Sequence, residues 1–180
     1  MIKNAILCEG SAEEAIIELL LMNNCLIIEN DESLLNEGPI RTRSADQFVN
    51  KHLGFSFKAP INVYRIIDSK NEKFNLSKKN QKIFEGKLII HNIITKPEIE
   101  ILIFIAEGHF DNYSRKKSKI KPSEYCKNIL KMKEVKSYHY VMAYFKNIDK
   151  LITSLIQYER YIGKHGNEES LVDLLKTEYK

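Results

Sequence analysis

Two acidic residues that lie far apart in the chain each follow a short apolar segment. Glu9 comes directly after "AILC", and Asp68 comes directly after "INVYRII". If both segments are parallel strands of one sheet, their carboxyl ends meet at the edge where such sheets bind ligands. Hard cations take oxygen ligands and use one or two protein carboxylates beside water and substrate phosphate. The pattern therefore predicts a Mg²⁺ or Mn²⁺ site for phosphoryl chemistry, with Glu9 and Asp68 as ligands or as acid and base.

Each of the two acids also has a structural interpretation. An acid before a helix stabilises the helix dipole by about 0.3–1 kcal/mol, and Asp readily forms hydrogen bonds within turns. However, Ser11 and Glu14 have the S-x-x-E spacing of a capping box. If these two residues satisfy the start of the helix, Glu9 is left free for a ligand.

The strands that would carry these acids alternate with helical patterns in the first part of the chain. Apolar runs rich in β-branched residues predict strands at 5–8, 25–30 ("CLIIEN"), 61–68 and 87–95. Apolar residues at helical spacing predict a helix from Ser11 that stops near Asn23, so the first two strands and this helix form a right-handed β-α-β unit. A loop is expected at 37–43, and short helices are expected at 44–54 and within 69–82. Thr95 with Glu98 repeats the capping box and predicts a buried helix that continues to about residue 114.

Beyond residue 120 the patterns are helical, at 122–132, 137–145, 148–163 and 167–179. The predicted fold class is α/β, with a mostly parallel sheet flanked by helices and a helical C-terminal extension. We expect residues 1–120 to form the α/β domain and residues 121–180 to pack on the same domain.

The composition suits one hydrophobic core. The chain has 180 residues, 43% of them hydrophobic, and a formal net charge of +4 that permits contact with nucleic acid without requiring it. Its three cysteines include no C-x-x-C pair, so neither a zinc site nor a disulfide framework is indicated. No apolar run approaches the roughly 20 residues that a bilayer requires. We therefore expect a cytoplasmic protein without a membrane segment.

Three segments together resemble the TOPRIM (topoisomerase-primase) family: "ILCEG" before a helix, "YRIIDS" at a strand end and "TKPEIEILI" at a later helix start. The similarity is greatest to the small, single-domain, nuclease-like bacterial branch found near restriction and phage-defence systems. It covers about the first two-thirds of the chain. The resemblance implies a parallel sheet flanked by helices, a catalytic glutamate at Glu9 and a metal-binding aspartate at Asp68.

The chain departs from the family pattern after the third strand. The family typically has Asp-x-Asp there, whereas this chain has Asp68 followed by Ser69 and Lys70. Glu72 is a candidate replacement for the missing carboxylate, which puts two-metal chemistry in doubt. The small relatives also tend to carry a glutamate in the "PEIE" helix, and this glutamate maps to Glu98 or Glu100.

Of the two glutamates in "PEIE", Glu98 has a capping role available to it. Glu100 instead lies within an apolar helix, where an unpaired charge is costly to bury. Its partner would be a metal, Arg65 or the sheet edge.

Basic residues suggest contact with phosphates. One run follows the apolar helix, and two arginines lie in the loop at 37–43; these candidate nucleic-acid contacts are Arg115, Lys116, Lys117, Lys119, Lys121, Arg41 and Arg43. Such runs track a phosphate backbone in nucleic-acid-binding proteins, although most charge runs are simply solvated faces.

The leading hypothesis is a Mg²⁺- or Mn²⁺-dependent, TOPRIM-like nuclease that cleaves the phosphodiester bonds of DNA or RNA. The alternative is a catalytically degenerate module of the same fold that binds nucleic acid or a protein partner. A third hypothesis is a regulatory subunit whose helical tail docks on an ATPase. The apolar faces of that tail also permit a homo-oligomer.

Overall fold

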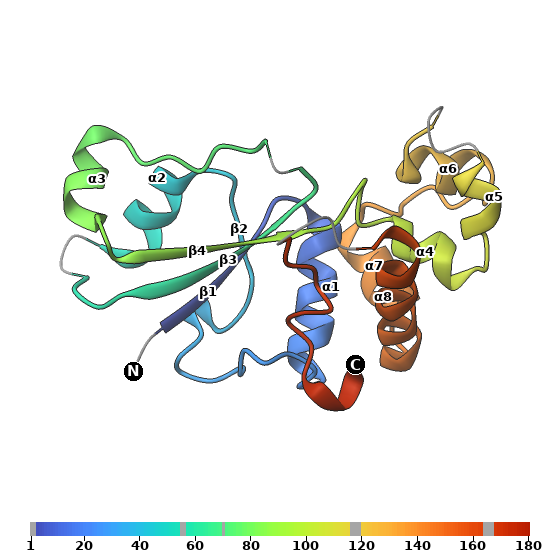
Figure 1. Cartoon of the computed structure of the whole chain (residues 1–180), viewed down its shortest axis with the longest axis horizontal. Coiled ribbons are helices and arrows are strands. Elements are labelled where there is room, and N and C mark those ends of the chain that lie inside the picture. The colour runs from blue at the N-terminus through green and yellow to red at the C-terminus, as the bar shows by residue number, and fades with distance from the viewer. Residues whose placement is uncertain (1–2, 55–56, 70, 116–119, 164–167) are drawn as a thin grey trace.

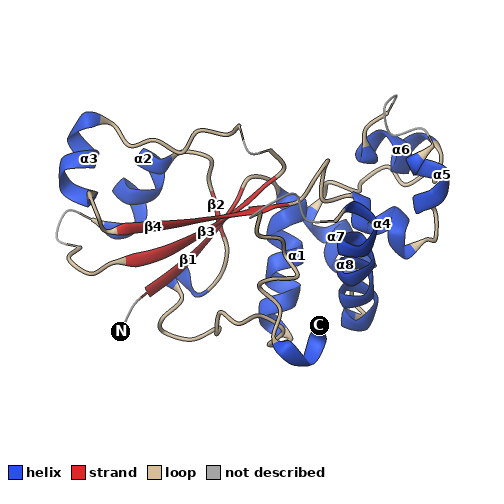
Figure 2. Ribbon diagram, in the orientation of Figure 1, coloured by secondary structure: helices blue, strands red, loops and turns tan. Residues whose placement is uncertain are grey.

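A four-stranded parallel sheet forms the centre of the computed structural model, which describes residues 3–54, 57–69, 71–115, 120–163 and 168–180 (Figures 1 and 2). The strand order is β2-β1-β3-β4, and every neighbouring pair is parallel. The strands are β1 (Lys3–Cys8), β2 (Ile40–Arg41), β3 (Ile61–Ile67) and β4 (Leu88–Ile94). The predicted α/β class with a parallel sheet is confirmed.

Helices cover both faces of this sheet. Successive side chains of a strand point to opposite faces, so Ala5 and Leu7 pack on one face and Ile6 and Cys8 on the other. The first face carries α2 (Ala45–Phe48), which continues as a π-helical turn (Val49–Leu53), and α3 (Lys78–Phe84). The second face carries α1 (Ser11–Met22), which is buried along most of its length.

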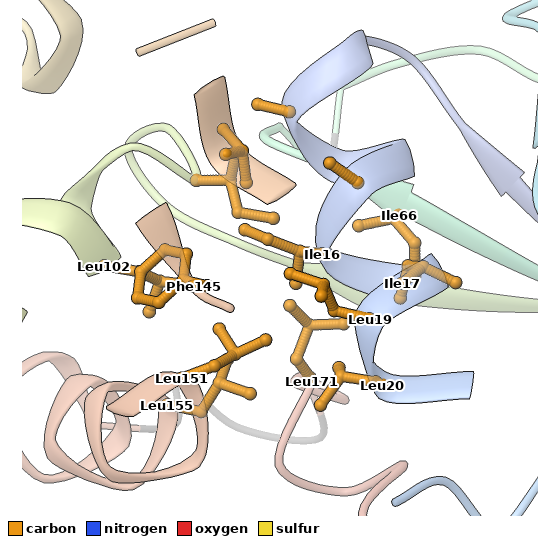
Figure 3. Close-up of a cluster of buried hydrophobic side chains, with 14 of the residues drawn as sticks. Ile16, Ile17, Leu19, Leu20, Ile66, Leu102, Phe145, Leu151, Leu155 and Leu171 are labelled. Carbon is orange, nitrogen blue, oxygen red and sulfur yellow. The ribbon is translucent and has the colours of Figure 1, made fainter. Parts of the chain in front are cut away.

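The second half of the chain builds a helical layer against α1. Its helices are α4 (Ile101–Ala106), α5 (Phe110–Ser114), α6 (Pro122–Asn128), α7 (Tyr138–Tyr144) and α8 (Ile148–Ile162). One apolar cluster joins α1, α4, α8 and the sheet, as the neighbouring side chains of Ile16, Ile66, Leu102 and Leu155 show in Figure 3. Of the helices that the structure describes, none combines the length and apolarity required to cross a bilayer.

Two predicted elements have a different structure. The segment 25–30 is not a strand of the sheet, because Leu26 makes only an isolated antiparallel bridge with Leu175. The strand that pairs with β1 on the side away from β3 is instead β2 (Ile40–Arg41), which was predicted to be part of a loop. The described part of the predicted C-terminal helix, 168–179, consists mostly of turns and ends in a short 3-10 helix (Thr177–Tyr179). This C-terminal segment lies beside α1 and contacts the residues that follow it, because Ile27 N donates to Leu174 O at 2.8 Å.

Both predicted capping boxes are wrong. The N-cap of α1 is Gly10, which makes no side-chain cap hydrogen bond, and the Ser11 hydroxyl instead accepts from Arg41 Nη1 at 2.8 Å. The predicted helix over 95–114 begins only at Ile101 and is divided at Gly108, which has a φ of 71°. Glu98 does not cap this helix, because its Oε2 accepts from the backbone N and the hydroxyl of Ser123 in α6.

Candidate metal centre

Three carboxylates meet at the carboxyl edge of the parallel sheet. Glu9, Asp68 and Glu72 each offer an oxygen, and these oxygens all lie within 4.8 Å of one another. Cys8 of β1 is in register with Ile66 of β3, so Glu9 and Asp68 leave adjacent strands at the same edge. Glu72 reaches the cluster from the loop that follows β3. The sheet thus brings together two of the acids that were predicted from strand ends and the replacement carboxylate from the loop.

The side chain of Glu9 in this cluster is largely buried. It is only 7% exposed, and the Glu9 Oε1 is buried without a hydrogen-bond partner among the described residues. Its Oε2 lies 3.9 Å from Nε of Arg43, which is itself 70% exposed. Burial, followed by a hydrogen bond and charge repulsion from Glu72, raises the pKa of Glu9 to about 8, although Arg43 opposes the shift. A buried carboxylate in this setting needs either a proton or a cation.

The donor set fits a hard divalent cation. Carboxylate oxygens are the ligands that Mg²⁺ and Mn²⁺ prefer, and the unpartnered Glu9 Oε1 is the kind of buried polar atom that a bound ion satisfies. Like-charged carboxylates this close repel one another unless a shared proton or a cation lies between them. Lys70, which stands in the second aspartate position of the family pattern, lies outside the described residues.

Two residues near this cluster were not predicted as part of a site. Glu13, one helical turn after Glu9, folds back so that a Cβ added to Gly10 would lie 2.6 Å from its Oε2. Burial and the nearby Asp68 raise its pKa, while its own backbone N–H opposes the shift. The only sequence signal for Glu13 was its spacing of four residues from Glu9.

Arg65, the second of these residues, is a nearly buried cation on β3. It lies under the Phe74 ring at 4.4 Å and donates to Asn92 Oδ1 at 3.0 Å. Burial lowers the pKa of Arg65, whereas the charges of Glu9 and Glu72 raise it. Arg65 therefore faces the acid cluster and is not the partner of Glu100.

Glu100 lies outside the three-carboxylate cluster. It is the N-cap residue of α4, is 5% exposed, and has its Oε1 4.0 Å from Nζ of Lys136. Burial raises its pKa to about 7, with its own backbone N–H and Lys136 opposing the shift. Lys136 also binds Glu98 at 3.3 Å, so this lysine supplies the partner that the sequence left open.

The basic candidates lie in two separate parts of the molecule. Arg41 and Arg43 lie on and after β2, beside the acid cluster, and Arg41 also approaches Glu14 at 3.6 Å. Arg115 follows α5 and Lys121 precedes α6, at the end of the molecule away from α2 and α3 (Figure 1). The remaining candidates, Lys116, Lys117 and Lys119, lie outside the described residues.

No protein-family model matches this chain, and neither a curated protein nor a solved structure is significantly similar to it. The class of protein that the fold defines is therefore an α/β protein with a parallel sheet, and the geometry of the site carries the functional proposal.

Proposed function

We propose that the protein is a nuclease of the TOPRIM type that hydrolyses phosphodiester bonds in nucleic acid with Mg²⁺ or Mn²⁺. The observation that carries this proposal is the buried, unpartnered Oε1 of Glu9 within a cluster of three carboxylates at the carboxyl edge of a parallel sheet. Ligands bind at this edge in open parallel sheets. The three motifs that resemble TOPRIM contribute two of these carboxylates, Glu9 and Asp68.

In this proposal Glu9, Asp68 and Glu72 hold the ion. The bound ion supplies Lewis-acid stabilisation of charge on a phosphoryl oxygen. Arg43, which is mostly exposed beside Glu9, is placed to bind a phosphate of the incoming strand. The buried guanidinium of Arg65 offsets part of the negative charge of the cluster, because it interacts electrostatically with Glu9 and Glu72.

A non-catalytic binding module is the second candidate, and the sequence after Asp68 favours it. Ser69 and Lys70 stand where the family has its second aspartate, so the carboxylate set differs from the family pattern. Glu72 supplies a third carboxylate from the loop and supports the catalytic proposal instead.

Cleavage of labelled single- and double-stranded DNA and RNA tests the two candidates. Wild type, Glu9→Gln and Asp68→Asn are assayed with Mg²⁺, Mn²⁺ or EDTA, with Asp111→Asn on α5 as a matched control. A nuclease loses cleavage in both site variants and in EDTA, and keeps it in the control. Equal cleavage in all four proteins would refute the assignment, and binding without cleavage in wild type would favour the module.

A further inference from the structure

A cavity of about 780 Å³ opens beside β2, at the edge of the sheet. Its volume lies within the range of small-molecule sites in proteins. It is lined by the loop before β2, by β2 itself and by α2 with its π-helical turn: Asn36, Pro39, Ile40, Arg41, Thr42, Gln47, Asn50, Lys51 and His52. Two of these residues are cationic and none is acidic, so the cavity favours an anionic ligand.

Hydrogen bonds hold two amides of this lining. Gln47 Oε1 accepts from the Thr42 hydroxyl at 3.5 Å, and Asn50 Oδ1 accepts from Asn80 Nδ2 at 3.1 Å. The NH₂ group of Asn50 is therefore the donor that its side chain offers to a ligand. The Thr42 hydroxyl has one proton and also lies 3.4 Å from Ser44 O, so Gln47 offers its amide as a donor or an acceptor. The one acid of α2, Asp46, is turned toward α3 and accepts from Ser77 and Asn80.

Residues 40–43 connect the lining of the cavity with the acid cluster. Arg41 is in register with Cys8, and Thr42 N donates to Cys8 O at 3.0 Å. Glu9 follows Cys8 directly, and its Oε2 lies 3.9 Å from the next residue of the edge segment, Arg43. A strand of nucleic acid with a phosphate at Glu9 would therefore pass Arg43 and Arg41 on its way into the cavity.

We propose that this β2 cavity binds one nucleotide of the substrate, next to the phosphodiester that is cleaved. The inference rests on the proposed function and deepens it by naming a nucleotide subsite. Arg41 and Lys51 would bind the phosphate, and the amides of Gln47 and Asn50 would bind the edge of the base. Pro39 and Ile40 supply an apolar surface for the sugar or the base.

The experiment measures binding without metal, so that it does not depend on cleavage. The probe is a fluorescent single-stranded oligothymidylate with a 5′-phosphate, titrated with wild type, Lys51→Gln and Lys3→Gln at several salt concentrations. Lys51 is exposed at the cavity, and Lys3 is exposed at the opposite, amino end of β1. We expect about tenfold weaker binding for Lys51→Gln, and a salt slope smaller by about 0.7. Lys3→Gln should bind as wild type does.

Competition between the probe and small ligands identifies the class of ligand that the cavity binds. Thymidine 5′-monophosphate should displace the probe at lower concentration than inorganic phosphate does, and this preference should shrink in Lys51→Gln. Equal displacement by the two competitors in wild type, or the same affinity in Lys51→Gln and Lys3→Gln, would overturn the subsite.

The subsite and the proposed function fail separately. Probe binding that depends on Lys51, together with no cleavage in any metal, supports the subsite and counts against the nuclease. Cleavage that depends on Glu9, together with probe binding that ignores Lys51, overturns the subsite alone. Circular dichroism and thermal unfolding of each variant test whether the exposed substitutions leave the fold intact.

Discussion

Replacing Glu9 by glutamine should stabilise the protein above neutral pH, because the buried carboxylate is costly to ionise. Its pKa rises from 4.5 to about 8 on folding, so the folded state holds the proton more tightly than the unfolded chain does. The contribution of this group to stability is therefore present below about pH 4.5 and is lost as the pH rises through 8. At about 1.4 kcal/mol for each pH unit between the two values, the limit is about 5 kcal/mol.

The measured gain should be smaller than this limit. A glutamine still leaves a buried polar oxygen to satisfy, which costs about 1–3 kcal/mol, and Arg43 loses its charged neighbour. We therefore expect Glu9→Gln to be about 2–3 kcal/mol more stable than wild type at pH 8.5, and the two stability curves to cross near pH 6, where the ionisation cost of Glu9 equals the cost of the buried glutamine. Urea unfolding across this range measures the difference, with the exposed Glu32→Gln as a control. Parallel curves for wild type and Glu9→Gln would refute the reasoning.

Wild type and Glu9→Gln also test whether the acid cluster binds a metal ion. A ligand at ten times its Kd stabilises the folded state by about 1.4 kcal/mol, which raises the Tm of a chain this long by about 3–5 °C. Mn²⁺ should produce this shift in wild type and a clearly smaller one in Glu9→Gln. An identical shift in both would place the ion elsewhere.

Three further outcomes are expected. Glu72→Gln should weaken Mn²⁺ binding measured by calorimetry, because it removes one of the three clustered carboxylates, whereas Glu124→Gln on α6 should not. Glu100→Gln should be more stable than wild type above pH 7, with the gain vanishing near pH 4.5, because burial raises the Glu100 pKa to about 7; a gain that is independent of pH in urea unfolding would contradict this. Leu20→Ala should lower the free energy of unfolding by about 3 kcal/mol, since Leu20 is fully buried in the cluster of Figure 3, and a loss below 1 kcal/mol would contradict its packing.

Local sequence patterns predicted β1, β3, β4 and α1 because each of them is a self-contained signal. "INVYRII" and "LIIHNII" are apolar and β-branched, and α1 ends at Met22 with Asn23 as its C-cap, where the pattern stops. The same local logic failed for "CLIIEN". That segment has the composition of a strand, but it packs beside the C-terminal segment, and the two-residue strand Ile40–Arg41 takes the place next to β1.

Strand ends predicted part of the site for a physical reason. Parallel strands must place their carboxyl ends at one edge, so two acids that end such strands lie at the same edge. Glu9 and Asp68 are neighbours there because β1 pairs directly with β3. Glu98 and Glu100 could not be assigned in this way. Their partners, Ser123 and Lys136, come from segments 25 and 36 residues further along the chain.

The amino-acid sequence by itself determined the fold class, the sheet edge of the candidate site and two of its acids. Only the tertiary structure decided that Glu72 completes the cluster, that the buried Arg65 interacts with its charges, and that the edge strand leaves a basic cavity beside Arg41. Hydrophobic periodicity and strand ends are local properties of a sequence. Burial of a charge and the approach of distant loops depend instead on how the elements pack, and no spacing along the chain encodes them.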